Sequence, residues 1–145
     1  MSACTFFGHR SCYGLEREVL YNAIESLIGQ DVDTFYVGNQ GQFDGMVHGC
    51  LKKLSKLYPH IRYSVVLAYF PAGNRALEDF SDTMYPEIEG PPRFAIDRRN
   101  KWMIDASDYC LCYIDHTWGG AYKFAMLAKK RGKILVNLAD DKVTL

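Results

Sequence analysis

The stretch "ACTFFGHRSCYGLEREVLYNAIESLIGQ", Ala3–Gln30, holds the pattern that decides the fold. It begins with a short apolar run that stops at Gly8, which is typical of a fully buried parallel strand. Apolar residues then recur at helical spacing as far as the region of Gly29, so residues 14–30 are predicted to form an amphipathic helix. A strand that leads directly into a helix is the repeating unit of an α/β protein.

The same alternation continues along the rest of the chain. Further strands are predicted at 34–38, 61–70, 109–114 and 133–139, and further helices at 43–58, 94–107 and 119–132. This order predicts a parallel sheet with helices on both faces and right-handed crossovers. We therefore expect one α/β domain over 1–145, a three-layer, doubly wound Rossmann-like sandwich with a mostly parallel five-stranded sheet.

One segment, residues 70–93, interrupts this pattern. It holds four of the five prolines and has no clear periodicity. Irregular connections of this length are uncommon in a compact domain unless they form a lid, a binding loop or a short insertion. We expect a lid-like loop here.

Composition narrows the classes of function. The chain has 145 residues, of which 17 are basic and 17 acidic, so its formal net charge is zero. That balance argues against a broad electrostatic footprint for nucleic acid, although a local basic pocket is compatible with it. No apolar run approaches the length of a membrane span, and the amino terminus lacks the features of a signal peptide. We expect a cytoplasmic protein without a membrane partner.

The five cysteines favour reduced thiols. Their number is odd, they contain no C-x-x-C pair, and Cys4, Cys110 and Cys112 fall in predicted strands as small buried hydrophobes. No cluster of histidine and cysteine has the spacing of a metal site. We therefore expect neither a metal nor a resident cofactor.

Three glycine-containing loops follow predicted strands: "GHRSCYG" at 8–14, "GNQGQFD" at 38–44 and "DHTWGG" at 115–120. In a parallel sheet these loops share one edge, where glycine lets backbone amides approach a phosphate and helix starts add N–H groups. The simpler alternative is that the glycines only make turns and that Asp44 only caps a helix. Their convergence predicts a site for a phosphorylated ligand.

Basic and aromatic side chains accompany these loops. His9 and Arg10 leave the first loop, and Arg99 lies on the helix before the fourth predicted strand, where arginine is suited to bidentate phosphate contact. Tyr13 and Trp118 lie in the glycine loops, where a ring can stack on a base, so the ligand is predicted to be a nucleotide. His9 is either protonated beside an anion or neutral and donating to a loop carbonyl, two alternatives that stay open.

Three stretches, "TFFGHR", "GNQGQFD" and "RNKWMIDASDYCLCYIDHTWGGAYKFAMLA", resemble the SLOG superfamily. This group joins the SMF/DprA Rossmann-like domains to the LOG phosphoribohydrolases, and the chain looks closest to its small single-domain YspA/YoqJ-like bacterial and phage members. The resemblance implies a Rossmann-like fold that binds nucleotides or nucleotide-derived molecules, including ADP-ribose-type signals. Relatives are often dimers or larger, so a homodimer is the oligomer that the resemblance implies. By position, the residues that match the motifs are Gly8 and Arg10 in the first loop, Gly38, Gly41 and Asp44 in the second, and Gly119 and Gly120 in the phosphate-binding glycine pair.

The chain departs from the LOG pattern where that pattern carries catalysis. Arg99 and Met103 match its R-K-x-x-M element, but Asn100 stands in place of the lysine. LOG enzymes also carry P-G-G-x-G-T-x-x-E with a catalytic glutamate, whereas here Trp118 replaces the proline and no acidic residue follows before Asp140. Cleavage of an N-glycosidic bond passes through a cationic state that a carboxylate stabilises. The loss favours binding without turnover.

Three hypotheses follow. The first is a sensor or sequestering module for a nucleotide-derived small molecule; the second is an N-ribosyl hydrolase or transferase in which Asp44 or Asp115 supplies the carboxylate and Arg99 orients the phosphate. The third, a single-stranded DNA or protein interaction module, is disfavoured by the zero net charge. The candidate binding residues are Gly8, His9, Arg10, Tyr13, Gly38, Asn39, Gln40, Gly41, Asp44, Arg99, Asp115, Trp118, Gly119 and Gly120.

Overall fold

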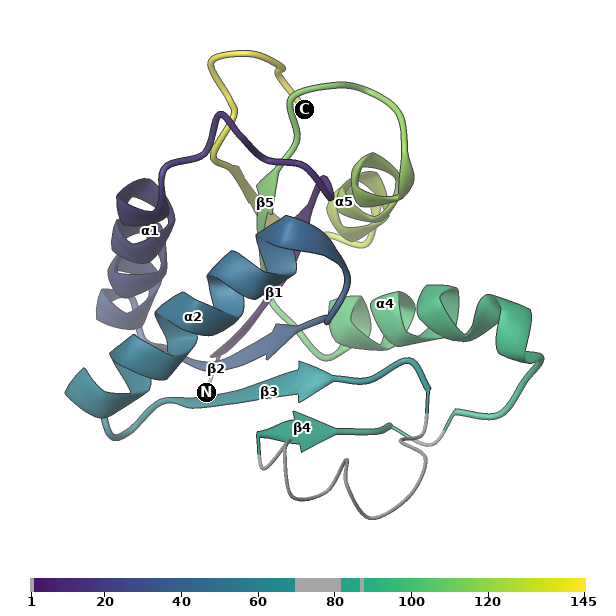
Figure 1. Ribbon diagram of the computed structural model, residues 1–145, viewed down its shortest axis with the longest axis horizontal. Helices are drawn as coiled ribbons and strands as arrows, with labels where there is room; N and C mark the ends of the chain where they lie inside the picture. The colour runs from purple at the N-terminus through teal and green to yellow at the C-terminus, as the bar shows by residue number, and fades with distance from the viewer. Residues whose placement is uncertain (1, 70–81, 87) are drawn as a thin grey trace.

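One parallel sheet with the strand order β4-β3-β2-β1-β5-β6 organises the residues that the computed structural model describes, 2–69, 82–86 and 88–145 (Figure 1). Every neighbouring pair of strands in it is parallel. The strands are β1 (Ser2–Gly8), β2 (Val32–Val37), β3 (Arg62–Val66), β4 (Thr83–Met84), β5 (Tyr109–Tyr113) and β6 (Ile134–Asn137).

Helices cover both faces of this sheet. Helices α1 and α2 lie on one face and α4 and α5 on the other, which gives three layers (Figure 1). A short 3₁₀ turn, η1 (Pro92–Phe94), leads into α4. The helices are α1 (Arg17–Gly29), α2 (Gly41–Leu57), α4 (Ala95–Asp105) and α5 (Gly120–Lys130).

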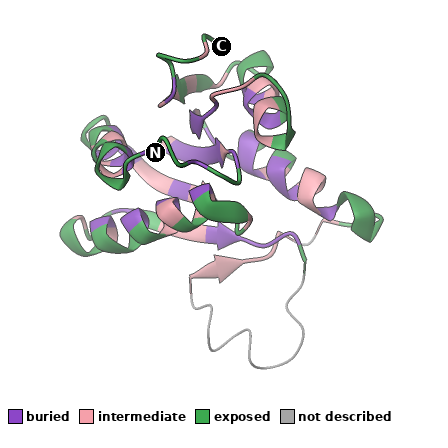
Figure 2. Cartoon of the chain, turned by 45° about the horizontal axis from the view of Figure 1, so that its top comes forward, coloured by how far each residue is buried: buried purple, intermediate pink, exposed green. Residues whose placement is uncertain are grey.

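The two helical layers bury two separate cores, and β1 contributes to both. Its side chains alternate, so Phe6 stacks on Phe35 of β2 with ring centroids 6.1 Å apart, and Phe7 stacks on Phe124 of α5 at 5.7 Å. Buried residues follow the central strands and the inner faces of the helices (Figure 2). Because both faces are covered, the central strands read as continuous apolar runs rather than as alternating ones.

The predicted fold class is confirmed, but the prediction of five strands is wrong. The sixth strand, β4, has only two residues, Thr83 and Met84, which pair with Val65 and Val66 of β3. A strand this short leaves no apolar run in the sequence. The third strand is also shorter than the predicted 61–70, because β2 ends at Val37, which pairs with Val65.

The predicted lid-like loop at 70–93 falls largely outside the described residues. Its described part contributes β4 and η1, and the lid itself stays a prediction. Within the described ranges, none of the helices combines the length and the apolar composition that crossing a bilayer requires. All five cysteines are free and buried, as expected for small hydrophobic side chains in the core.

We expect Gly8→Ala to destabilise the protein. Gly8 ends β1, and a Cβ atom there would overlap the ring of Phe43, which is fully buried in α2. Forcing an extra carbon into a packed core costs about 1–3 kcal/mol of the free energy of unfolding. Urea denaturation measures this loss.

The matched control is Gly49→Ala, in the middle of α2, where an added Cβ meets no atom within 4 Å. It is expected to stabilise the protein by up to about 1 kcal/mol, because alanine is the better helix former. A Gly8→Ala variant as stable as the parent would show that Phe43 moves aside without cost.

Candidate functional site

A cavity of about 510 Å³ opens at the carboxyl ends of the central strands. The chain runs from β1 outward through β2, β3 and β4, and then returns to the other side of β1 to form β5 and β6. Open α/β sheets bind ligands at the point where the strand order reverses in this way. The lining residues are Phe6, Phe7, Gly8, His9, Arg10, Ser11, Gln40, Asp44, Ile96, Arg99, Asn100, Met103, His116, Gly119, Gly120, Ala121 and Phe124.

The loop after β1 forms one wall and is fastened to the start of α2. The N–H of Gln42 donates to the carbonyl of Arg10, and the N–H of Cys12 donates to Oε1 of Gln42, both at 3.0 Å. Gly41 has a φ of +87°, and a Cβ there would lie 3.0 Å from Cα of Arg10, so this close approach needs glycine. The guanidinium of Arg10 is exposed and makes no contact with a polar partner among the described residues, which leaves it available to an anion.

The start of α5 forms the opposite wall. Its N-cap is Gly119, with a φ of 92° and a ψ of 173° and no side chain to accept the first N–H groups of the helix. These N–H groups lack helical partners and lie at the positive end of the helix dipole. A Cβ added at Gly120 would meet no atom within 4 Å, so the backbone there is open to a ligand. This wall has the geometry of a phosphate site.

A buried guanidinium lies between these walls. Arg99 of α4 is only 3% exposed. Its Nη1 donates to the carbonyl of Val66 at 2.9 Å and to Oδ1 of Asn39 at 3.2 Å, and its Nε donates to Oδ1 of Asn100 at 2.7 Å. These hydrogen-bond acceptors are neutral, and the negative charge that acts on Arg99 comes mainly from the carboxyl group of Asp44.

The carboxyl group of Asp44 shares this part of the cavity with Arg99. A Cβ at Gly38 would lie 2.9 Å from Oδ2 of Asp44 and 3.0 Å from Cζ of Arg99, so the glycine makes room for both. Burial raises the pKa of Asp44 to about 6, although the N–H of Gln40, 2.9 Å from Oδ2, and the charge of Arg99 both act to lower it. Asp44 therefore changes its charge close to neutral pH.

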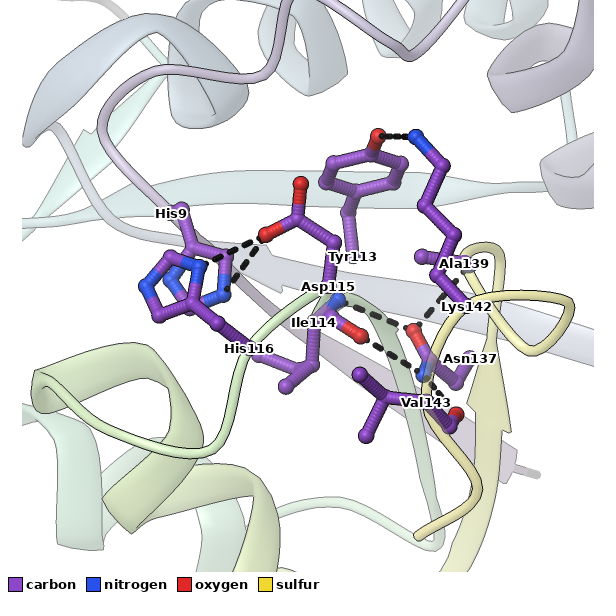
Figure 3. Close-up of polar contacts among 9 residues, drawn as sticks. All are labelled: His9, Tyr113, Ile114, Asp115, His116, Asn137, Ala139, Lys142 and Val143. Atoms are coloured by element: carbon purple, nitrogen blue, oxygen red, sulfur yellow. Dashed lines mark hydrogen bonds and ion pairs between the residues drawn. The ribbon is translucent and has the colours of Figure 1, made fainter.

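Two imidazole rings and a carboxylate form a second polar cluster at the cavity (Figure 3). The rings of His9 and His116 stack with centroids 3.4 Å apart and planes 11° apart. Oδ1 of Asp115 lies 2.7 Å from Nδ1 of His116 and 3.5 Å from Nε2 of His9. Burial and the neighbouring His116 lower the pKa of His9, with Asp115 opposing them, which favours the neutral imidazole.

The main chain that carries Asp115 is held by Asn137 of β6 (Figure 3). Oδ1 of Asn137 accepts from the N–H of Ile114 at 2.9 Å, and Nδ2 of Asn137 donates to the carbonyl of the same residue at 3.0 Å. This pair of hydrogen bonds fixes the residue just before Asp115. The loop that follows carries the ring of Trp118, which is 68% exposed and lies 4.0 Å from the ring of His116.

The structure brings most of the predicted site residues together. Those that line the cavity are Gly8, His9, Arg10, Gln40, Asp44, Arg99, Gly119 and Gly120. Asn39, Asp115 and Trp118 do not line it but contact side chains that do. Gly38 makes room for the side chains of Asp44 and Arg99, Gly41 allows the close approach of Arg10, and Tyr13 is 90% exposed outside the lining.

One face of α4 also lines the cavity, and sequence reasoning took only Arg99 from it. Ile96, Asn100 and Met103 join Arg99 on this face, at the i, i+3, i+4 and i+7 spacing of one helix stripe. Extending that stripe from Arg99 would have found all of them. Asn100, which stands where LOG enzymes have lysine, accepts a hydrogen bond from Arg99 that a lysine could not accept.

These features define a class of protein: a doubly wound Rossmann-like α/β fold with a candidate site at its switch point. Among solved structures, the chain is similar to DNA processing protein A (DprA) from Streptococcus pneumoniae, with a TM-score of 0.68 and 15% identity over 94% of this chain and 50% of that one. It is also similar to DprA from Helicobacter pylori, a protein that binds single-stranded DNA, with a TM-score of 0.65 and 14% identity over 94% of this chain and 64% of that one.

These likenesses confirm the SMF/DprA type of Rossmann-like fold, and at such identities they show the fold alone. The chain spans half the length of the first protein and less than two thirds of the second. No protein-family model and no curated protein matches the sequence.

Asp44→Asn is expected to stabilise the protein at neutral pH and to leave it unchanged in acid. The pKa of Asp44 rises from 3.8 to about 6 on folding, so the folded state holds the proton more tightly, and stability falls as pH rises through this window. Asparagine still accepts the N–H of Gln40 but carries no charge. We expect a gain of about 3 kcal/mol in the free energy of unfolding near pH 7.5 and none below about pH 3.

Urea denaturation over a series of pH values measures this difference. Asp140→Asn, at an exposed carboxylate outside the cavity, is the matched control and is expected to change stability little at any pH. Equal stability of the parent and Asp44→Asn throughout the series would mean that Asp44 titrates as it does in an unfolded chain.

Proposed function

We propose that this chain binds a nucleotide or nucleotide-derived small molecule of the ADP-ribose type in the cavity at the switch point. It holds the ligand without turnover, as a sensor or a sequestering module, since the SLOG superfamily that it resembles includes branches that bind ADP-ribose-type signals. The observation that carries this proposal is the convergence of Arg10, Arg99 and the open start of α5 on one cavity of about 510 Å³.

The charge of the cavity supports an anionic ligand. Arg10 is exposed and has no partner among the described residues, and the amides of α5 begin at a glycine N-cap. Arg99 adds a buried positive charge, which the carboxyl group of Asp44 opposes when it is ionised. A phosphate placed between Arg10 and Gly120 would accept from a side chain and from backbone N–H groups together. The cavity volume falls within the range of about 300–1,000 Å³ that small-molecule sites occupy.

The aromatic side chains support a ligand that carries a base. Trp118 is largely exposed and extends the stacked rings of His9 and His116 from the same loop that leads to Gly119. An exposed indole beside a phosphate site offers a face on which a base stacks. A nucleotide has both groups, with a sugar between them.

Two arguments favour binding over turnover. Helix α5 has no acidic residue at all, and Met126 stands where the LOG motif carries its catalytic glutamate. Asp44 is the carboxylate that lines the cavity, and it already accepts the N–H of Gln40 at the start of α2. This hydrogen bond gives Asp44 a structural role in holding the loop before α2, and that role accounts for the carboxylate without a catalytic one.

A second candidate function rests on the same residue. With a pKa of about 6, Asp44 gives up and takes back a proton near neutral pH, as a general acid or base must. An N-glycosidic hydrolase or transferase acting on a nucleoside monophosphate would use Asp44 in this role and Arg99 to orient the phosphate. Release of free base by the parent, and its loss in Asp44→Asn, is the result that this candidate requires.

The first experiment follows AMP, NAD and ADP-ribose by ligand-observed NMR over hours, so that binding and turnover are read in one sample. We expect the signals of an ADP-ribose-type ligand to broaden and its spectrum to stay unchanged. Arg10→Ala and Gly120→Asp are each expected to weaken the affinity at least about tenfold, because the first removes a cation and the second adds a carboxylate at the anion site.

Matched controls keep the result specific. Arg17→Ala removes another exposed arginine, away from the cavity, and Gly49→Asp adds a carboxylate on α2 at a position where a Cβ meets no atom within 4 Å. Both are expected to bind as the parent does. Affinity unchanged in Arg10→Ala and Gly120→Asp would overturn the proposal, and a preference for single-stranded DNA over every nucleotide tested would favour the activity of the Helicobacter pylori relative instead.

A further inference from the structure

The cluster of His9, Asp115 and His116 gathers three groups that bind metal ions (Figure 3). We propose that Nε2 of His9, Oδ1 of Asp115 and Nδ1 of His116 form a binding site for a divalent transition metal ion of the zinc class. These three atoms are separate from the groups proposed to bind a phosphate, which are Arg10 and the start of α5. The metal proposal therefore does not depend on the nucleotide proposal.

The distances between the ligand atoms fit one ion. One ligand atom from each of the three side chains lies within 4.8 Å of the other two. In a tetrahedral zinc site with bonds of about 2.0–2.1 Å, ligand atoms are about 3.3 Å apart. Nε2 of His9 and Oδ1 of Asp115, at 3.5 Å, already have nearly this spacing, whereas Nδ1 of His116, at 2.7 Å from the same oxygen, is at hydrogen-bond distance.

Binding therefore requires one movement, in which the ring of His116 turns out of its stack on His9 so that Nδ1 aims at the ion. The contacts that this turn must break are the stack on His9, the contact with the Trp118 ring and the hydrogen-bond contact with Asp115. The side chain is 29% exposed and belongs to the loop that ends at Gly119, so it has solvent on one side into which to turn. His9 stays in place, because its main-chain N–H donates to the carbonyl of Tyr113 in β5.

One buried nitrogen in this cluster has no hydrogen bond. His9 is 7% exposed, and its Nε2 makes no hydrogen bond with any of the described residues; it has only the 3.5 Å ion-pair contact with Oδ1 of Asp115. Buried polar atoms without a partner are rare in folded proteins, and each one calls for a cause. A metal ion bound at Nε2 supplies the missing partner and lies on the side where Asp115 and His116 are found.

The donor set selects the kind of metal. Two imidazole nitrogens and one carboxylate oxygen suit zinc and its neighbours in the first transition row, whereas magnesium prefers oxygen ligands alone. With three protein ligands, a fourth position stays open to water or a ligand. His9 and His116 both line the cavity, so we place that open position toward it.

Zinc titration of the chelator-treated full chain, with a fluorescent zinc chelator as competitor, tests the proposal. We expect saturable binding of a single zinc ion per chain that magnesium does not displace. Asp115→Asn and His116→Ala are each expected to weaken zinc affinity at least about tenfold, with an unchanged circular dichroism spectrum. These two side chains are partly exposed, so their variants avoid the folding risk of His9→Ala.

The chain provides its own matched control. Nε2 of His48 lies 2.7 Å from Oδ2 of Asp82, the same distance as in the His116–Asp115 pair, but no group of three ligands in the described residues includes it. His48→Ala is therefore expected to bind zinc as the parent does. Equal loss in His48→Ala and His116→Ala would show adventitious binding to surface histidines and overturn the proposal.

Cobalt substitution identifies the ligands independently of affinity. A tetrahedral or five-coordinate cobalt ion on nitrogen and oxygen gives visible absorption without the thiolate-to-cobalt charge-transfer band. We expect such a spectrum in the parent and its loss in Asp115→Asn. Absence of zinc binding in the parent, or a thiolate band from any of the buried cysteines, would overturn the assignment to His9, Asp115 and His116.

Discussion

The hydrogen bonds of one buried cation hold the cavity in shape. Arg99 joins the end of β3 through the carbonyl of Val66, the loop after β2 through Asn39, and α4 through its neighbour Asn100. A guanidinium removed from water must have its donors satisfied, since an unpaired buried charge is costly. The positions of α4, of the end of β3 and of the loop after β2 are therefore coupled through Arg99. Without these hydrogen bonds the side chain of Arg99 would turn toward water, and the three segments would lose the link that keeps the cavity open.

This constraint gives the cavity an ordered distribution of charge. On the buried side, Arg99 faces a carboxyl group, Asp44, whose charge depends on pH. On the exposed side, Arg10 and the start of α5 offer positive charge without a counter-ion among the described residues. The stacked imidazoles and Trp118 add flat surfaces beside the same loop. A ligand that matches the exposed positive charge and the flat aromatic surfaces is anionic at one end and aromatic at the other.

The sequence predicted the architecture because the signals for it are local. Apolar runs and helical spacing placed each long element to within a few residues, and the glycine loops lie at the edge of the sheet where the cavity opens. The short strand β4 was missed, since the two residues Thr83 and Met84 form a strand only through pairing with β3. The roles of the glycines also depend on tertiary contacts: Gly38 and Gly41 pack against Arg99 and Arg10, whereas Gly120 faces open space.

The buried thiols described above have a consequence for measurement. Cys4, Cys12, Cys50, Cys110 and Cys112 come from both cores and both sides of the sheet, and each is at most 2% exposed. A thiol reagent in solution reaches them only when the surrounding structure opens, so the rate of labelling at each position reports the free energy of that opening. Cys12 lies in the loop after β1, whereas Cys110 and Cys112 lie within β5. The native cysteines therefore form an unengineered set of probes that separates local opening of the site from global unfolding.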